Sequence, residues 1–422
     1  MNDGNAGSRY AIVDNWPDNS NENLGARGRS DDLLRMFARQ RSRSRRRITF
    51  SQGWWSARRS CLGEHTSRSG RTGRSSSALR LMSRPAAGSH SGFMMARRYR
   101  NLIGRIVSPR NMEAALRLTA AGKRLTPGYL EFKEFSALNL ADLAREMADG
   151  SYVAGTPHEF HIFDPKKRLI SALPFRDRVA QQALCLVVAP IFDSALLPRA
   201  FACRPGKGTH AGVVQLQSEL RREVGATHFL KTDFSAYFAS IERPVLWQLI
   251  EAKISCRLTL RLIGAMVPRF GIGLPIGSLT SQIFANLYTG ATLDRYLQQT
   301  LGERLWYRYM DDLVVLGANS AHLAKVKIAI EEYSRDHLGL RFSKWQVAPV
   351  SRGINFLGYR IWASHKLLRK DSVTRARRKI AAYRAAGDHE RLRKFIAAWL
   401  GHAGWADSAN LIRSLGLSGR GS

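Results

Sequence analysis

The chain has 422 residues, which is enough for two or three domains with a substantial buried core. Its 66 Lys and Arg residues against 33 Asp and Glu residues give a formal charge of +33, which indicates a polyanionic partner, with an anionic membrane surface as the alternative. No apolar run approaches the roughly 20 residues of a bilayer span, no signal peptide opens the chain, and the four cysteines show no Cys-x-x-Cys spacing. These features argue against a membrane protein, a disulfide framework and a zinc site, and we expect a soluble cytoplasmic protein.

Residues 1–93 differ in composition from the rest. The first hundred residues hold 20 Arg, no Lys and 7 acidic residues, and the segment is rich in Ser, Gly and Asn. The basic run Arg39–Arg47 has no hydrophobic periodicity, which predicts disorder. An RNA-binding arm is one interpretation. The one we favour is that the working start lies at Met94 or Met95 and that the extension is not a designed domain.

From about residue 99 the sequence has the periodicities of a globular domain. Helical spacing and strand alternation predict helices at 111–122 and 138–149 and a strand at 158–163. A basic strand and turn over 166–178 then leads into an apolar helix at 179–188. Several cations at this place suit a triphosphate clamp, since arginine binds phosphate oxygens through two hydrogen bonds. Our candidates are Arg168 and Arg178.

Two later loops are rich in glycine. Phe201–His210 contains Gly-Lys-Gly-Thr but lacks the full Walker spacing, so it is not predicted to be a P-loop. Residues 271–282 precede a long helix that is expected to run through Leu301. Glycines let a ligand approach the backbone, and polar side chains at a helix start can face a base or a sugar. The candidates for such contacts are Gly277, Ser281 and Gln282.

An acidic hairpin is the feature around which the chain is organised. Residues 305–317 place Asp311 and Asp312 between two apolar runs, which predicts two strands with the acids at their turn. An upstream apolar strand at 227–233 ends on Asp233. Neighbouring buried carboxylates repel each other unless they share a cation, and Mg²⁺ prefers carboxylate and phosphate oxygens. We therefore predict that these three acids hold two Mg²⁺ ions, with Mn²⁺ as an alternative.

The remainder of the chain predicts a helix that covers the sheet and a basic helical module. The covering helix is expected at 321–337, and 355–361 is typical of a short hairpin. Basic helical stretches follow at 375–386 and 391–399. Such a module suits the minor groove of a nucleic-acid duplex.

These motifs, in this order, resemble reverse transcriptases over the chain from about Tyr99 to its end. Asp233 followed by Tyr-Met-Asp-Asp at 309–312 is that family's signature. The resemblance implies an RNA-directed DNA polymerase that uses a template RNA, a DNA or RNA primer and deoxynucleoside triphosphates. Two motifs resemble the diversity-generating branch of the family: Arg-x-Gly-Lys-Gly-Thr-His at 204–210 and Ile-Gly-x-x-x-Ser-Gln at 276–282.

The diversity-generating branch has further implications. Its members, in bacteria or phages, copy a template RNA into cDNA, err at adenines and work with a small basic accessory protein. Most other reverse transcriptases have Gln at the position of Ile276, so a looser grip on the template nucleotide is implied here, although Ser278 replaces the branch's usual Asn. The Asn-rich segment Asp14–Arg27 resembles the end of the variable region in the targets of such elements, which supports an open reading frame that reads through a template copy.

The resemblance also implies roles for single residues. Phe238 would lie under the sugar of the incoming nucleotide and exclude a 2′-hydroxyl, and the backbone of Phe234 would contribute to the metal and triphosphate site. Lys344 corresponds to a lysine that protonates the leaving pyrophosphate as a general acid. The 355–361 hairpin resembles the primer grip, whose members here are Phe356, Leu357, Gly358 and Tyr359. Ordinary packing or solvated surface is the alternative for each of them.

The predicted fold is α+β: a right-hand polymerase with fingers, a palm built on an antiparallel sheet, and a helical thumb. The predicted boundaries are 1–93 for the extension, 94–225 for the fingers and N-terminal palm, 226–363 for the palm with the catalytic motifs and 364–422 for the thumb. Since the chain stops there, no maturase or endonuclease domain is expected. The alternatives are a group II intron-type or phage-defence reverse transcriptase and, in another class, a non-catalytic RNA-binding protein.

Overall fold

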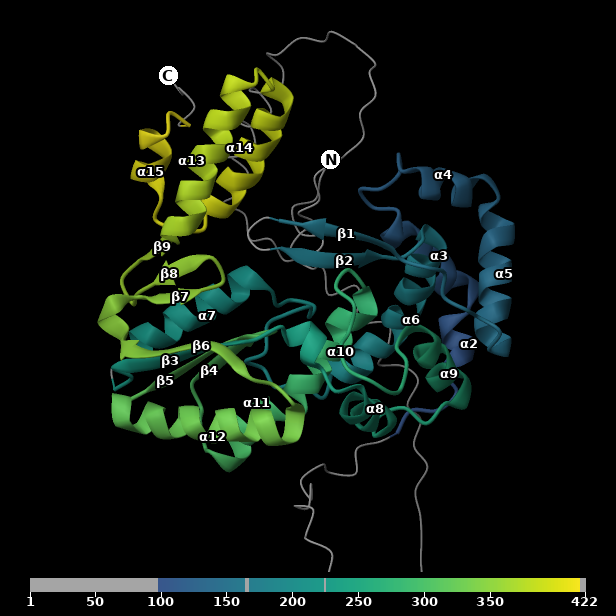
Figure 1. Cartoon of the computed structure of the whole chain (residues 1–422), viewed down its shortest axis with the longest axis horizontal. Coiled ribbons are helices and arrows are strands. Elements are labelled where there is room, and N and C mark those ends of the chain that lie inside the picture. The colour runs from purple at the N-terminus through teal and green to yellow at the C-terminus, as the bar shows by residue number, and fades with distance from the viewer. Residues whose placement is uncertain (1–97, 164–166, 224, 418–422) are drawn as a thin grey trace, which may run out of the picture. The chain divides into compact units, whose positions relative to one another are not determined.

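A four-stranded antiparallel sheet forms the centre of the computed structural model, which describes residues 98–163, 167–223 and 225–417 (Figure 1). The order across the sheet is β4 (Trp306–Tyr309), β5 (Asp312–Gly317), β3 (His228–Phe234) and β6 (Phe342–Pro349). The predicted strand that carries Asp233 is confirmed, although it ends one residue later, at Phe234, and the predicted hairpin with the acids at its turn is also confirmed. The extension predicted at 1–93 lies outside the described residues.

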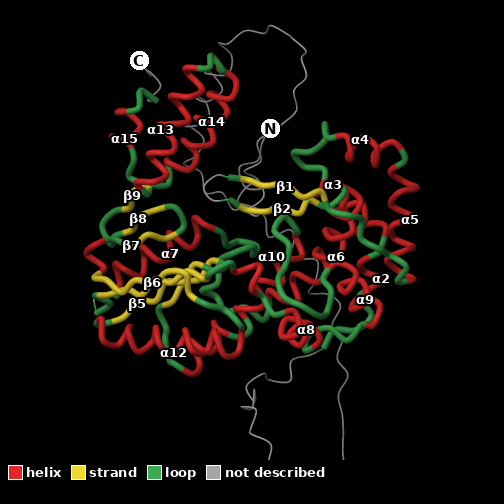
Figure 2. The backbone as a smooth tube through the Cα atoms, in the orientation of Figure 1, coloured by secondary structure: helices red, strands yellow, loops and turns green. Residues whose placement is uncertain are grey.

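Side chains alternate between the two faces of the sheet, so each face has its own core. In β5, Leu313 and Val315 belong to one hydrophobic cluster together with the buried residues of α12 (Ser320–Leu338). Val314 belongs to a second cluster together with α7 (Thr209–Arg222). The sheet therefore lies between α12 and α7, and the prediction that a helix at 321–337 covers it is confirmed (Figure 2).

Helices packed around α6 (Phe175–Asp193) make up the N-terminal part. α6 is buried over most of its length, and its second half, from Ala183 to Phe192, is an almost continuous apolar run. The N-terminal helices that contact it are α2 (Ile103–Ile106), α3 (Pro109–Thr119), α4 (Pro127–Glu134) and α5 (Ser136–Asp149), and a later helix, at 279–290, also packs against it. β1 (His158–Ile162) and β2 (Arg168–Ala172) form a separate hairpin. The predicted helices and strand of this part are confirmed, and α6 extends beyond the predicted 179–188 at both ends.

The segment between β3 and β4 is helical. It contains α8 (Arg243–Glu251), α9 (Arg257–Met266), α10 (Leu279–Gly290), α11 (Leu293–Arg295) and a π-helical turn at 296–300. The prediction of one helix from the loop through Leu301 is wrong, because Thr292 has φ −119° and ψ −83° and breaks it. Its hydroxyl donates to the Tyr288 carbonyl, a side-chain bond that competes with the helical ladder.

The C-terminal part joins a small sheet to a helical module. The sheet contains β7 (Ile354–Phe356), β8 (Tyr359–Ile361) and β9 (Lys366–Leu368), and the module contains α13 (Lys370–Ala385), α14 (His389–Ala403) and α15 (Ala409–Ser414). The hairpin and the two basic helices predicted here are confirmed, whereas β9 was not predicted. The α+β class with an antiparallel central sheet is also confirmed. No helix in the described ranges is both long enough and apolar enough to cross a membrane.

Candidate active site

The turn between β4 and β5 carries the two adjacent acids. Tyr309 pairs with Asp312, so Met310 and Asp311 form a two-residue turn. Met310 is buried with a φ of 54°, a conformation that costs a non-glycine residue roughly 1–2 kcal/mol. Positive φ at the first turn residue alone is the type II′ pattern, which matches the twist of paired strands. The turn therefore places Asp311 at the end of the sheet and Asp312 as the first residue of β5.

Strand register brings a third acid beside this turn. Asp233 is the partner of Asp312 in the β3–β5 pair and of Lys344 in the β3–β6 pair. Directly paired residues of antiparallel strands point to the same face, with Cα atoms about 4.5–5.5 Å apart. Asp312, Asp233 and Lys344 thus form one row across three strands, next to Asp311. Ser343 donates to Asp233 Oδ2 at 3.3 Å.

The surroundings disfavour negative charge on the two turn acids. Burial raises the pKa of Asp311 to about 6, and the carboxylates of Asp233 and Asp312 add to the shift. The Arg168 guanidinium opposes it. Burial also raises the pKa of Asp312, against the opposing effect of Lys231. Like charges held this close favour the binding of a cation that would compensate them.

Lys231 supplies positive charge to this cluster. It lies two residues before Asp233 on the same face of β3, and its ammonium group makes an ion pair with Asp312. Among the described residues, no group of three or more Asp, Glu, His or Cys side chains is arranged closely enough to form a ready metal site. The donor chemistry nevertheless fits Mg²⁺, because three mutually repelling carboxylates offer the oxygen ligands that it prefers. The residues that would hold it are Asp233, Asp311 and Asp312.

Comparison with known protein families shows which kind of enzyme carries such an acidic cluster. Residues 163–361 match the family model of reverse transcriptases, which are RNA-dependent DNA polymerases, and this range includes all three acids. The chain contains a reverse transcriptase domain. Its α+β architecture, with the acids on an antiparallel sheet between N-terminal helices and a C-terminal helical module, is that of the predicted right-hand polymerase. The predicted enzyme class, RNA-directed DNA polymerase, follows from this domain.

Individual relatives are distant. Protein YkfC of Escherichia coli (strain K12) is 24% identical over 65% of this chain and 84% of its own length. Nuclear intron maturase 2, mitochondrial, of Arabidopsis thaliana is 28% identical over 23% of this chain, which spans only 15% of the maturase. Among solved structures, apo telomerase from Candida tropicalis, truncated from its C-terminal domain, aligns over 56% of this chain and 60% of its own. The TM-score of this alignment is 0.40 and the sequence identity is 12%.

The two arginines predicted to clamp a triphosphate have different surroundings in the reverse transcriptase domain. Arg168 is exposed at the start of β2. Its positive charge lowers the pKa of Asp311, so its guanidinium lies near enough to the acids to interact with them electrostatically. Arg178 lies in the first turn of α6, where its Nε donates to the Leu173 carbonyl at 2.7 Å and burial lowers its pKa. Arg168 is therefore the better placed of the two to meet a phosphate.

The aromatic residues after Asp233 pack against the core. Phe234 is buried, with its ring 5.1 Å from that of Phe342, so only its backbone can serve a metal or a triphosphate. Phe238 is half-buried and lies edge-on to the Tyr237 ring at 5.6 Å. Its carbonyl accepts a hydrogen bond from the Leu274 amide at 2.8 Å. This bond fixes the turn that carries Phe238 to the glycine-rich loop at 271–282.

The same loop is bonded to the β1–β2 hairpin, a connection that the sequence did not indicate. The Ser171 amide donates to the Ile276 carbonyl at 2.9 Å. Gly277 has a φ of 112°, and a Cβ there would lie 3.0 Å from the Ser171 carbonyl oxygen. Glycine is therefore required at 277 by the approach of β2. The packing of β2 is enough to explain the glycine at 277, and the predicted approach of a ligand to it stays a prediction.

Ser281 and Gln282 were predicted to face a base or a sugar. Both are buried, with relative exposures of 1% and 3%. The Gln282 Oε1 accepts a hydrogen bond from Cys203 Sγ at 3.3 Å. Their side chains thus point into the interior, because α10 is surrounded by α6 and α8. In this structure only their backbone is available to a nucleotide.

The hairpin predicted as a primer grip packs on the helical module. Phe356 and Tyr359 are fully buried, and the turn residues Leu357 and Gly358 both have positive φ. The Tyr359 hydroxyl bonds to His402 Nδ1 at 2.9 Å. A Cβ at Gly358 would lie 3.2 Å from the His402 ring. The close approach expected of a primer backbone at Gly358 is thus made here by α14.

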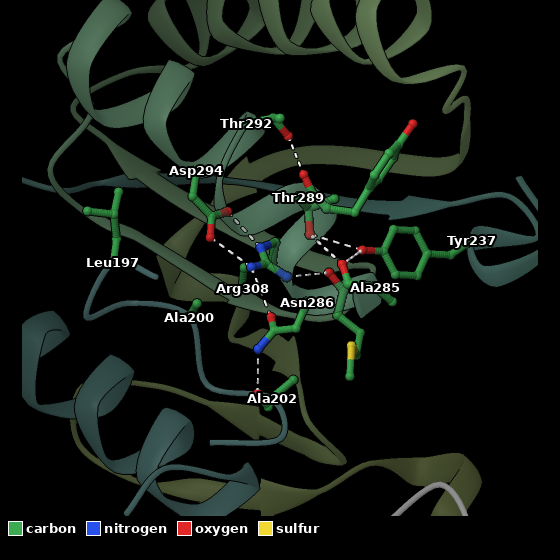
Figure 3. A network of polar contacts seen from close by, with 12 residues as sticks. Leu197, Ala200, Ala202, Tyr237, Ala285, Asn286, Thr289, Thr292, Asp294 and Arg308 are labelled. Carbon is green, nitrogen blue, oxygen red and sulfur yellow. Dashed lines mark hydrogen bonds and ion pairs between the residues drawn. The ribbon is translucent and has the colours of Figure 1, made fainter. Parts of the chain in front are cut away.

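Sequence reasoning missed two charged residues of the reverse transcriptase domain. Lys231 had a usable signal, because strand alternation places it on the face of Asp233. Arg308, which follows Tyr307 and precedes Tyr309 in β4, is fully buried and bonds to Asp294 (Figure 3) and to the Met310 carbonyl. Its signal was an arginine inside a run of aromatic residues. A charged side chain in a buried strand needs a partner of opposite charge, so this arginine indicated a buried ion pair.

Proposed function

We propose that the protein copies a template RNA into DNA by extending a primer 3′-hydroxyl with deoxynucleoside triphosphates. The observation that carries this proposal is the register of β3 and β5, which pairs Asp233 with Asp312 beside Asp311 inside a reverse transcriptase domain. These acids would hold two Mg²⁺ ions, or Mn²⁺. When bound, such ions lower the pKa of the attacking hydroxyl and neutralise charge on the leaving pyrophosphate.

The chain's own side chains would bind, orient and select around that centre. Arg168 binds a phosphate of the incoming nucleotide, and Lys344, in the row of the acids, holds the proton that the pyrophosphate takes up. Phe238 excludes a 2′-hydroxyl. The exposed arginines of α13 hold the backbone of the template-primer duplex, for which their positive charge is suited. In this assignment the fingers lie in 94–225, the palm in 226–363 and the thumb in 364–422.

Primer extension on an RNA template with Mg²⁺ tests this function. The wild type should extend the primer with deoxynucleotides, and chelation of Mg²⁺ should stop it. The alternative of a non-catalytic RNA-binding protein predicts retention of the RNA without extension, with or without Mg²⁺. Asp336→Asn is a suitable control, because it removes an exposed carboxylate of α12 that pairs only with Arg335 in the described structure.

We further propose that the protein belongs to the diversity-generating branch, copies the RNA of a template repeat and works with a small basic accessory protein. The support is the Ile-Gly-x-x-x-Ser-Gln form at 276–282. A group II intron-type enzyme is the second candidate, which the similarity to an intron maturase favours. Sequencing of cDNA made from the cognate RNA separates them, since substitutions concentrated at template adenines are expected only of the first.

Ile276→Gln should make the enzyme more accurate at adenines. The backbone bond from Ser171 to residue 276 does not depend on the side chain, so the loop is expected to keep its conformation. A polar amide at this position adds a hydrogen bond to the template nucleotide, and errors at adenines should fall about tenfold. Deep sequencing of products from one RNA template measures this. Unchanged adenine errors in the folded variant would overturn the assignment of residue 276.

Phe238→Val should admit ribonucleotides. The smaller side chain removes the ring that would collide with a 2′-hydroxyl, and the ratio of kcat/KM for ribonucleotides to that for deoxynucleotides should rise up to about 100-fold. Single-nucleotide incorporation with each substrate measures the ratio. If Phe238 only packs against Tyr237, both substrates will be affected equally and the ratio will stay at its wild-type value.

A further inference from the structure

A buried polar network is centred on β4 (Figure 3) and reaches the β4–β5 turn through a hydrogen bond to the Met310 carbonyl. Its centre is Arg308, whose side chain has no exposed surface. The guanidinium binds Asp294 of α11 through two hydrogen bonds, Nε to Oδ1 at 2.6 Å and Nη2 to Oδ2 at 2.7 Å. Taking two charges out of water is unfavourable, and apolar residues of similar volume are often at least as stabilising as such a pair. Stability alone therefore does not account for it.

The remaining donors of Arg308 reach the turn and its neighbours. Nη1 donates to the Met310 carbonyl at 3.1 Å, and Nη2 donates to Asn286 Oδ1 at 3.1 Å. Asn286 in turn donates to the Ala202 carbonyl at 2.8 Å. The backbone of Arg308 also pairs with Phe201, whose amide donates to the Arg308 carbonyl at 2.9 Å. Asp294 and Asn286 thus fix the guanidinium and Phe201 fixes the backbone of Arg308, while Nη1 holds the turn.

The bond to Met310 acts on Asp311 through the peptide plane. The Met310 carbonyl and the Asp311 amide belong to one planar group, so fixing the direction of the carbonyl also fixes the entry of the chain into Asp311. Met310 has a φ of 54°, a conformation that a non-glycine residue keeps only when its surroundings hold it. Arg308 supplies part of that restraint.

We propose that Arg308, held by Asp294 and Asn286, is a positioning residue that sets the orientation of the Met310–Asp311 peptide and with it the Asp311 carboxylate. The inference rests on the proposed polymerase function, in which this carboxylate must meet the reacting phosphate in one geometry. Arg308 contacts neither substrate nor metal in this account. It acts through the turn, and a misplacement of about 1 Å at a reacting group costs roughly 100-fold in rate.

The main test removes both charges of the pair, with Arg308→Met and Asp294→Leu in one protein, so that no unpaired charge remains in the core. We expect a melting temperature near that of the wild type, a kcat about 100-fold lower, and a KM for deoxynucleotides that changes less than about threefold. Hydrogen–deuterium exchange over 306–317 should rise, while exchange in α12 should not. If Arg308 only neutralises Asp294, the folded double variant will keep wild-type kcat and exchange, which would overturn the inference.

Arg308→Lys is the second variant, in case the double variant does not fold. An ammonium group compensates Asp294 but lacks the planar fork that serves three partners at once, so the same loss of kcat is expected, and wild-type kcat would contradict the proposal. Tyr288→Phe is the matched control. It removes a buried hydrogen bond of α10, from the Tyr288 hydroxyl to the Leu338 carbonyl at 2.8 Å, and should lower the melting temperature without changing kcat.

The proposed function and the positioning role fail in different ways. A wild type that extends no primer refutes the function, whereas an active wild type with equally active Arg308 variants refutes only the positioning role. The exchange measurement needs no activity. Unchanged exchange over 306–317 in a folded Arg308 variant therefore contradicts the positioning role in either case.

Discussion

Asp311→Asn should abolish DNA synthesis and, at the same time, make the folded protein more stable at pH 7. We expect kcat to fall about 1,000-fold or more, because a neutral amide cannot hold the cations that balance charge at the reacting phosphate. Single-turnover primer extension measures this loss. Thermal unfolding without divalent ions measures the stability.

The expected gain in stability follows from the raised pKa of Asp311. Its pKa of about 6 in the folded protein exceeds the ordinary value of 3.8, so the folded state binds the proton more tightly than the unfolded chain does. The destabilisation is fully present above pH 6 and fades as the pH falls towards 4. Replacing the acid by an amide should therefore stabilise the fold by about 1–3 kcal/mol at pH 7 and by almost nothing near pH 4.

Asp336→Asn is the control for both measurements, because its carboxylate is exposed and pairs with Arg335 on α12 rather than with the acids of the turn. It should change neither kcat nor the pH dependence of the Asp311 effect. An Asp311→Asn variant that keeps activity within about tenfold of the wild type would contradict a role in binding the ions. An Asp311→Asn variant that unfolds more easily than the wild type at pH 7 would contradict the claim that the ionised Asp311 carboxylate destabilises the folded protein.

The rate of polymerisation should depend steeply on pH below 6. Since Asp311 must be ionised to bind a cation and its pKa is raised to about 6, kcat/KM at subsaturating Mg²⁺ should fall about tenfold per pH unit below that value. Higher Mg²⁺ should move this acidic limb to lower pH, because a cation favours the ionised carboxylate. Steady-state rates at several Mg²⁺ concentrations measure the shift.

Lys231 provides a check on this explanation. Its ammonium group lowers the pKa of Asp312, which must also be ionised to bind the cations, so Lys231→Met should move the acidic limb to higher pH. Lys327→Met is the matched control, since Lys327 pairs with Glu331 on α12. An acidic limb that does not respond to Mg²⁺ would show that another group limits the rate. A limb that does not respond to the loss of Lys231 would show that Asp312 is not among the limiting groups.

The central hairpin was predictable because its signals are local. β5 is buried on both faces, so Leu313 to Leu316 form a continuous apolar run, and the two acids before it mark the turn. The α12 helix was predictable from its helical spacing. The break at Thr292 was not, because the apolar spacing continues through Leu301 and the helix ends through a side-chain bond.

The partners of the site residues depend on tertiary structure. That Lys344 lies opposite Asp233 follows from the strand order β5-β3-β6, which no local pattern encodes. Ser281 and Gln282 were expected at a ligand because polar residues at a helix start often face one. α10 is buried on nearly all sides, including theirs, because α6 and α8 pack against it.

The most direct test of the central claim is a crystal structure of the protein with a template-primer, a non-reactive deoxynucleotide analogue and Mn²⁺, whose anomalous scattering locates each ion. The account predicts two Mn²⁺ peaks, both in contact with carboxylate oxygens of the group Asp233, Asp311 and Asp312, with Lys231 displaced from Asp312. It would be contradicted by a fully bound duplex with no Mn²⁺ at these acids, or with Asp233 more than about 10 Å from the other two.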